Sequence, residues 1–214
     1  MKQISFFFDP ISPYAYLAFE KLPEALMGHS YTVDYKPVLF GALLKHHGQL
    51  GPAEMAGKRD WTYRQVLWLG QRHGLPLDLP ASHPFNPLHL LRLAVACGEA
   101  GRVNRFVAET LLRHVWTGGA EAADPQRLQA LAEQLKPARD PGSEAVKAEL
   151  KANTEEAIAL GVFGVPTIAV DGRLFWGFDA LPMLGDYLAG EPWFAGPQWD
   201  DVRKHPVGVV RPRA

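Results

Sequence analysis

Ser12 stands at the junction of a short apolar segment and a helix-forming segment, where a hydroxyl group could do chemistry. Residues 3–8 are mostly apolar and end at Asp9-Pro10, and Ser12-Pro13 then opens a run of aromatic and small residues. A serine before a proline at the first helical position is typical of an N-cap. Backbone N–H groups at a helix start face outward, and the helix dipole favours an anion there. Ser12 is therefore either a cap alone or a hydrogen-bond donor to a thiolate that a ligand brings.

A second candidate is the sequence Val165-Pro166-Thr167, in which a proline directly precedes a predicted strand. A cis bond at this proline would turn the N–H and C=O groups of Val165 toward the helix start. Those groups could then pair with an extended peptide ligand, like an added strand. The other interpretation is a trans proline at a strand start, which occurs in many folds. The sequence leaves the two open.

Strands and helices that could position these residues lie at both ends of the chain. The pattern predicts a strand over 3–8, a helix after Ser12, and a second strand over 31–39. Near the other end it predicts a loop running into a strand over 161–170, a turn at Asp171-Gly172, a strand over 173–176 and a helix over 181–188.

Helical periodicity fills the middle of the chain. The predicted helices cover 59–73, 88–100, 103–116, 125–134 and 143–160. The order β-α-β, helices, β-β-α is the thioredoxin arrangement with an insertion. We therefore predict an α/β class and a thioredoxin-like fold with a helical insertion domain. Its parts are a discontinuous thioredoxin-like domain (1–40 and 161–190), an inserted all-helical domain (41–160) and an irregular C-terminal tail (191–214).

Composition excludes several classes of function. The 214 residues include 22 basic and 23 acidic ones, so the net charge of −1 gives no general attraction to nucleic acid or acidic lipid. No apolar stretch is long enough for a membrane span or a signal peptide, and we expect a cytoplasmic protein. The single Cys97 excludes a disulfide scaffold and a two-cysteine redox enzyme, and we expect a buried, inert thiol in mid-helix. His46-His47 lacks further ligands at metal spacing and indicates a solvated loop, so no metal is expected.

Two separated motifs carry a resemblance to a known family. They are the stretch from Phe6 to Leu17 (FFFDPISPYAYL) and the stretches 161–167 (GVFGVPT) and 171–177 (DGRLFWG). Over residues 2–190 the chain resembles the 2-hydroxychromene-2-carboxylate isomerase family, which is similar to kappa-class glutathione transferases and to the disulfide oxidoreductase A group. In the redox-active relatives the loop holds Cys-X-X-Cys. Here residues 12–15 are Ser-Pro-Tyr-Ala, so dithiol exchange is absent.

The resemblance implies a glutathione-dependent cis–trans isomerase that acts on a small aromatic keto-acid-type substrate, in a homodimer. Ser12 matches the serine that stabilises the glutathione thiolate. The residues implied to contact glutathione are Ser12, Gln49, Lys58, Val165, Pro166, Gly177, Phe178, Asp179 and Ala180. Phe85 and Asn86 are implied to line the substrate site.

Several positions depart from the family pattern. Gln49 is one methylene longer than the usual asparagine, and Phe178 and Ala180 lack polar side chains that would hold the glutathione carboxylates. Glu54-Met55 replaces a substrate-contacting pair, so the natural substrate stays open. The alternatives are a kappa-like glutathione transferase that conjugates electrophiles and a redox-inactive thioredoxin-fold module that binds peptides or proteins.

Overall fold

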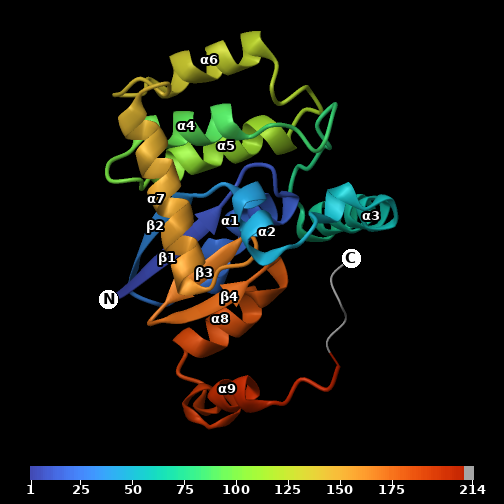
Figure 1. Cartoon of the computed structure of the whole chain (residues 1–214), viewed down its shortest axis with the longest axis vertical. Helices are drawn as coiled ribbons and strands as arrows, with labels where there is room; N and C mark the ends of the chain where they lie inside the picture. Colours follow the sequence, from blue (N-terminus) through green and yellow to red (C-terminus); the bar gives the residue numbers. More distant parts are fainter. Residues whose placement is uncertain (210–214) are drawn as a thin grey trace.

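A four-stranded mixed sheet forms the centre of the molecule (Figure 1). The structure is a computed structural model that describes residues 1–209. Its strands are β1 (Lys2–Phe8), β2 (Tyr31–Pro37), β3 (Thr167–Val170) and β4 (Arg173–Trp176), in the order β2-β1-β3-β4. The β1 and β2 strands are parallel, whereas β3 is antiparallel to β1 and β4.

The helices follow the predicted order of elements. They are α1 (Pro13–Ala25), α2 (Phe40–His47), α3 (Ala56–His73), α4 (Leu88–Cys97), α5 (Arg105–Trp116), α6 (Pro125–Leu135), α7 (Glu144–Leu160), α8 (Leu181–Leu188) and α9 (Gln198–Asp201). Short 3-10 turns are η1 (Pro52–Glu54), η2 (Phe178–Ala180), η3 (Pro192–Ala195) and η4 (Val202–Lys204). The predicted thioredoxin-like arrangement with helices between its two halves is confirmed.

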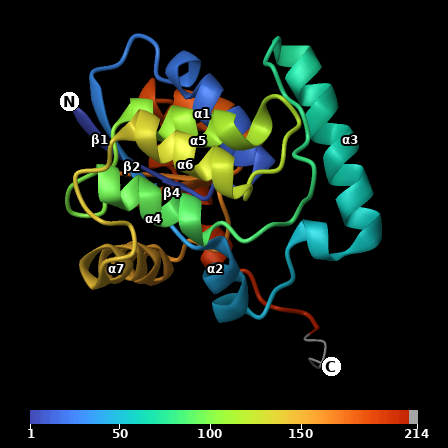
Figure 2. The ribbon, with the colours of Figure 1, turned by 90° about the horizontal axis from the view of Figure 1, so that it is seen from above.

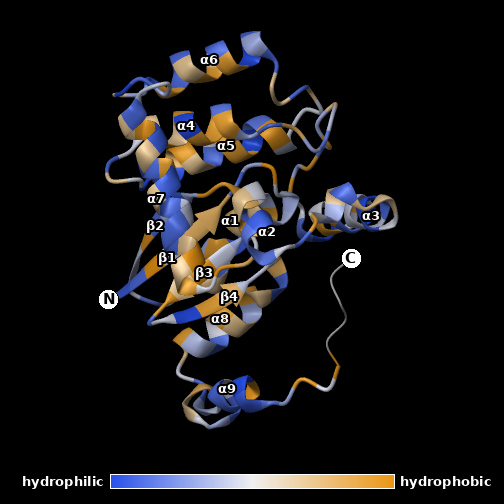
Figure 3. Cartoon of the chain, viewed as in Figure 1, coloured by the Kyte–Doolittle hydropathy of each residue, from blue (hydrophilic) through white to orange (hydrophobic). Residues whose placement is uncertain are grey.

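Both faces of the sheet are buried, which explains the unbroken aromatic run in β1. Phe6 and Phe8 point to one face and pack in the main core with residues of α1, such as Phe19. Phe7 points to the other face and packs with Leu43 of α2 and Ala157 of α7. Successive side chains of a strand alternate between faces, so a strand covered on both sides is continuously apolar. The hydrophobic colouring of Figure 3 accordingly gathers on the central strands, while α9 is largely hydrophilic.

The helices between the two halves of the sheet form a layer beyond one end of it, and α3 lies to the side (Figures 1 and 2). The α7 helix connects this layer to the sheet. Its first half, with Val146 and Leu150, packs on α4, whereas Ala157 packs with the residues of the sheet. The division of the chain into domains at 40/41 and 160/161 stays a prediction, because α7 belongs to both packing regions.

The prediction of an irregular tail over 191–214 is wrong for part of that range. Residues 192–204 form η3, α9 and η4, and Phe194 is buried against the main core. The Arg173 guanidinium lies 4.9 Å from the ring centroid of Trp199 and donates to the Phe194 carbonyl at 3.0 Å. Aromatic contacts, which sequence periodicity does not register, hold this segment on β4. The last part of the predicted tail, 210–214, lies outside the described residues.

Two further expectations need correction. His46 and His47 end α2 instead of lying in a solvated loop, and the Nε2 of His47 lies 3.2 Å from the Val162 carbonyl oxygen. Cys97 is the last residue of α4 and is half-buried, not buried in mid-helix, and burial raises the pKa of its thiol.

Among the described residues no cluster of three metal-ligating side chains occurs, and none of the described helices could cross a membrane.

Candidate active site around Ser12

Ser12 joins the start of α1 to the loop before β3. Its Oγ accepts a hydrogen bond from the Ala15 N–H at 3.2 Å, which makes it the N-cap of α1. The same hydroxyl donates to the Val165 carbonyl at 3.1 Å, although 153 residues separate the two in the chain. The side chain is buried at the end of β1, where the first N–H groups of α1 and its dipole favour negative charge. The structure thus brings together the two candidates that the sequence singled out.

The Val165-Pro166 peptide bond is cis. The Val165 carbonyl faces Ser12, and within residues 1–209 the Val165 N–H donates to no acceptor. An unpaired N–H beside a C=O that accepts from a side chain is a backbone unit with which an extended ligand could pair. The Pro166 carbonyl, in contrast, accepts from the Gly177 N–H at 2.9 Å, which fixes the turn after β4 beside this loop.

Buried side chains hold the backbone of the loop that presents Ser12. Asp9 is fully buried, and its carboxylate accepts from the Ile11 N–H and from the Phe40 N–H, each at 3.0 Å. The Trp116 indole donates to the Pro10 carbonyl at 2.8 Å. Burial raises the pKa of Asp9 from 3.8 to about 7, because the two backbone donors offset only part of the desolvation of the charge.

His83 holds the other side of the same peptide unit. Its Nε2 lies 2.8 Å from the Ile11 carbonyl oxygen, and since a carbonyl only accepts, this nitrogen carries the proton. Its Nδ1 lies 2.8 Å from the Tyr63 hydroxyl, which donates to it. Burial lowers the pKa of His83, in keeping with a neutral ring, whereas the contact with Ile11 acts in the opposite direction. Both polar groups of the Ile11 backbone, next to Ser12, are therefore fixed by side chains.

The turn after β4 supplies a further group of predicted residues. Gly177 has φ +96°, which strains any larger residue, and an added Cβ there would also displace Asp179 Oδ1, which lies 2.5 Å away. Phe178, Asp179 and Ala180 form η2, which packs against α1. Burial is the main cause that raises the pKa of Tyr14, and the charge of Asp179 raises it further. Asp179 is thus an exposed carboxylate close to the first turn of α1.

Gln49 and Lys58 are less firmly connected to this site. Gln49 follows the C-cap Gly48 of α2, and Lys58 lies in the first turn of α3; both are exposed. In the described part of the chain no hydrogen bond or ion pair joins either side chain to Ser12 or Val165. The contact of His47 with Val162 does bring the end of α2 to the loop that leads to Pro166. Contact of either residue with glutathione stays a prediction.

Phe85 and Asn86 lie between α3 and α4. The Phe85 ring is half-buried, and its centroid is 6.0 Å from that of His83. The Asn86 side chain accepts from the Leu88 N–H at 3.1 Å, a local bond at the start of α4 that accounts for its polar group. Phe85 therefore contacts the residue that fixes the Ser12 loop, and a substrate contact by either residue stays a prediction.

Sequence reasoning missed Asp9, Tyr63 and His83. Asp9 carried a signal, because an acidic residue directly after a continuously apolar strand is buried with it. His83 gave no comparable signal. It meets Ile11 across 72 positions of the chain, and sequence spacing does not predict such contacts.

Comparison with known proteins identifies the family of the chain. The model of the DSBA-like thioredoxin domain family matches residues 3–189. The 2-hydroxychromene-2-carboxylate isomerase of Sphingobium xenophagum is 30% identical over 194 residues, which cover 87% of this chain and 98% of that protein. Glutathione S-transferase kappa 2 of Caenorhabditis elegans is 29% identical over 216 residues, which cover 92% of this chain and 95% of that protein.

A solved structure of a 2-hydroxychromene-2-carboxylate isomerase superposes with a TM-score of 0.73. It is 23% identical, and the match covers 94% of this chain and 98% of that chain. This likeness shows the fold. The family model spans most of the sequence and shows that the chain belongs to the DSBA-like thioredoxin domain family.

Proposed function

We propose that the protein is a glutathione-dependent cis–trans isomerase of the 2-hydroxychromene-2-carboxylate isomerase type. The observation that carries the proposal is the 3.1 Å contact between the Ser12 hydroxyl and the Val165 carbonyl at the start of α1. It places a hydroxyl donor, a helix N-terminus and an unpaired backbone N–H at one point. The isomerase relative at 30% identity supports the reaction class.

The residues present fit glutathione. The unpaired N–H and the carbonyl of Val165 can pair with the backbone of its cysteinyl residue, as a strand edge does. A ligand N–H that donates to the Val165 carbonyl would replace the Ser12 hydroxyl as its donor. The hydroxyl is then free to turn toward the ligand sulfur, while the Ala15 N–H keeps the oxygen in place. Asp179 would meet the cationic γ-glutamyl end of the ligand.

Ser12 and α1 can supply the free energy needed to keep a thiolate. Lowering the pKa of a free thiol by about two units from about 8.5 requires roughly 2.7 kcal/mol. A hydrogen bond to a charged group contributes roughly 1.5–3 kcal/mol. The helix N-terminus adds roughly 0.3–1 kcal/mol, and more where it is partly buried. These contributions together are sufficient without a metal ion.

Bound glutathione would supply a thiolate that adds reversibly to the activated double bond of an unsaturated keto acid, so that the bond rotates before elimination. The chain provides the binding edge at Val165, the donor at Ser12 and the rigid loop from Asp9 to Ser12. Preorganised donors of this kind need no rearrangement during the reaction. Phe85 and Asn86 are proposed to contact the aromatic part of the substrate. We further propose a cytoplasmic homodimer with no nucleic-acid or membrane partner.

Isothermal titration with reduced glutathione tests the cofactor site. We expect saturable binding at one site per chain, weakened in an Asp179→Asn variant and unchanged in Asp186→Asn, which removes an exposed carboxylate on α8. No binding up to millimolar glutathione would contradict the proposal. It would favour a redox-inactive module that binds peptides through the Val165 edge.

A kappa-like glutathione transferase is the second candidate, because a kappa relative is 29% identical over most of the chain. The two activities differ in their products. The isomerase leaves glutathione unchanged and converts the substrate to its isomer, whereas the transferase consumes glutathione and forms a thioether. Mass spectrometry of the products therefore separates them. A Ser12→Ala variant should lose either activity, and retained activity would contradict the role of Ser12.

A further inference from the structure

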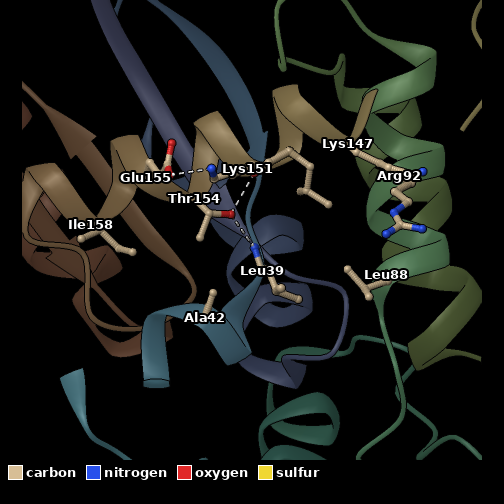
Figure 4. Close-up of a pocket in the computed structure, with 10 residues that line it drawn as sticks. Leu39, Ala42, Leu88, Arg92, Lys147, Lys151, Thr154, Glu155 and Ile158 are labelled. Carbon is tan, nitrogen blue, oxygen red and sulfur yellow. Dashed lines mark hydrogen bonds and ion pairs between the residues drawn. The ribbon is translucent and has the colours of Figure 1, made fainter. Parts of the chain in front are cut away.

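A groove opens between α2, α4 and α7, and none of the candidate site residues lines it (Figure 4). Its volume is about 340 Å³. The Leu39 N–H, just before α2, donates to the Thr154 Oγ1 of α7 at 3.1 Å, and Thr154 in turn donates to the Leu150 carbonyl at 2.9 Å. The first of these bonds joins the α2 and α7 walls of the groove.

Aliphatic side chains form the inner part of the groove. Leu39, Ala42, Leu88 and Ile158 line it, and each is only partly buried. Water therefore contacts apolar surface on three different helices at one place. An apolar molecule that fills the groove would remove this surface from water, which is favourable in proportion to the area covered.

Basic side chains lie along the groove, and one of them lacks a partner. Lys147 pairs with Glu144 at 2.7 Å, and Lys151 pairs with Glu155 at 3.5 Å. Arg92 of α4 makes no ion pair with any residue in the range 1–209, and its Nε is buried without a hydrogen-bond acceptor. A buried donor without an acceptor costs free energy, so Arg92 favours an acceptor supplied from outside the chain.

We propose that this groove binds a small aromatic monocarboxylate, with its carboxylate on Arg92 and its ring on the aliphatic wall. The planar guanidinium presents parallel N–H donors that match the two oxygens of a carboxylate. Lys147 and Lys151 also line the groove, each paired with a glutamate, which leaves Arg92 as the charged group for the ligand. A groove of about 340 Å³ suits a compact aryl group and is at the small end of ligand sites. Inorganic phosphate would satisfy Arg92 and leave the aliphatic wall uncovered.

Titration with 2-naphthoate in the presence of saturating glutathione tests the proposal. We expect saturable binding that an Arg92→Gln variant weakens by about ten- to hundredfold, the loss typical of one hydrogen-bonded charge. An Arg72→Gln variant, which removes an exposed guanidinium on α3, should bind as the wild type does. The uncharged analogue 2-naphthylmethanol should bind at least tenfold more weakly than 2-naphthoate.

A second variant keeps the proposal testable if Arg92→Gln does not fold. Ala42→Phe fills the groove from α2 and should abolish 2-naphthoate binding while the circular dichroism spectrum and glutathione binding stay unchanged. Absence of saturable binding to the wild type would overturn the proposal. So would binding that persists in both variants, or binding that is lost only in Ser12→Ala, which would place the ligand at the Ser12 site instead.

Discussion

Replacing Asp9 by asparagine should reverse the order of stability between wild type and variant as the pH rises. The wild-type carboxyl group is fully buried, and its pKa is raised from 3.8 to about 7. The folded state therefore binds the proton more tightly than the unfolded chain, and the stabilising contribution is present at low pH and lost as the pH rises through about 7. The difference of about 3.2 pKa units corresponds to about 4 kcal/mol.

The asparagine variant has no such titration, but its amide has a single acceptor oxygen for the Ile11 and Phe40 N–H groups. One of these donors would face the amide NH₂ group, at a cost of about 1–3 kcal/mol. Near pH 4 we thus expect wild type to be the more stable protein by that amount. Near pH 8 it should have lost about 4 kcal/mol relative to the variant, which makes Asp9→Asn the more stable protein.

Urea unfolding at the two pH values measures the difference directly. His83 and other titrating groups are present in both proteins, so their contributions cancel in the difference. Asp186→Asn is the matched control for the loss of a carboxylate, because Asp186 is exposed whereas Asp9 is buried. A difference between wild type and Asp9→Asn that is the same at both pH values would refute the reasoning, as would a relative gain of wild-type stability at high pH.

Three further substitutions test individual contacts, two of them near the site and one in α6. His83→Phe keeps the ring contacts and leaves the Ile11 carbonyl without its donor; we expect a loss of about 1–3 kcal/mol in urea unfolding, and unchanged stability would contradict that contact. Gly164→Ala would place a Cβ 2.6 Å from Trp176 Nε1; the variant should bind glutathione more weakly and show altered tryptophan fluorescence, and wild-type behaviour in both would be contrary to expectation. Asp124→Ala removes the side chain that caps α6 through the Arg127 N–H, so the free energy of unfolding should fall by about 1 kcal/mol with no effect on glutathione binding.

Local signals in the sequence predicted most of the architecture. Strand β4 and helix α8 have the predicted bounds, and the Asp171-Gly172 turn marks the start of β4 clearly. The α2 helix carried weaker signals, since Leu39 offers no side-chain cap and two histidines end it. Its helical form follows from packing of Leu43 against the sheet.

The candidate site was predictable at the two positions where a residue stands directly before a proline, because such a pair occurs in few structural settings. Ser12 before a proline and Val165 before a proline were both identified, and the structure joins them at 3.1 Å. The residues that support them were less predictable, although Asp9 directly follows the apolar end of β1. Asp9 and His83 act on the Ile11 backbone through contacts that depend on tertiary packing, and neither belongs to a recognisable spacing.

The ionisation of bound glutathione reports on the proposed role of Ser12. The ultraviolet absorbance of the thiolate is followed against pH for the complex with glutathione, with the S-methylglutathione complex as the blank. We expect a thiol pKa about two units below the free value of about 8.5 in the wild type, and a return of about one to two units toward that value in Ser12→Ala. Equal pKa values in the two proteins, or an unshifted value in the wild type, would contradict the assignment of Ser12 as the thiolate donor.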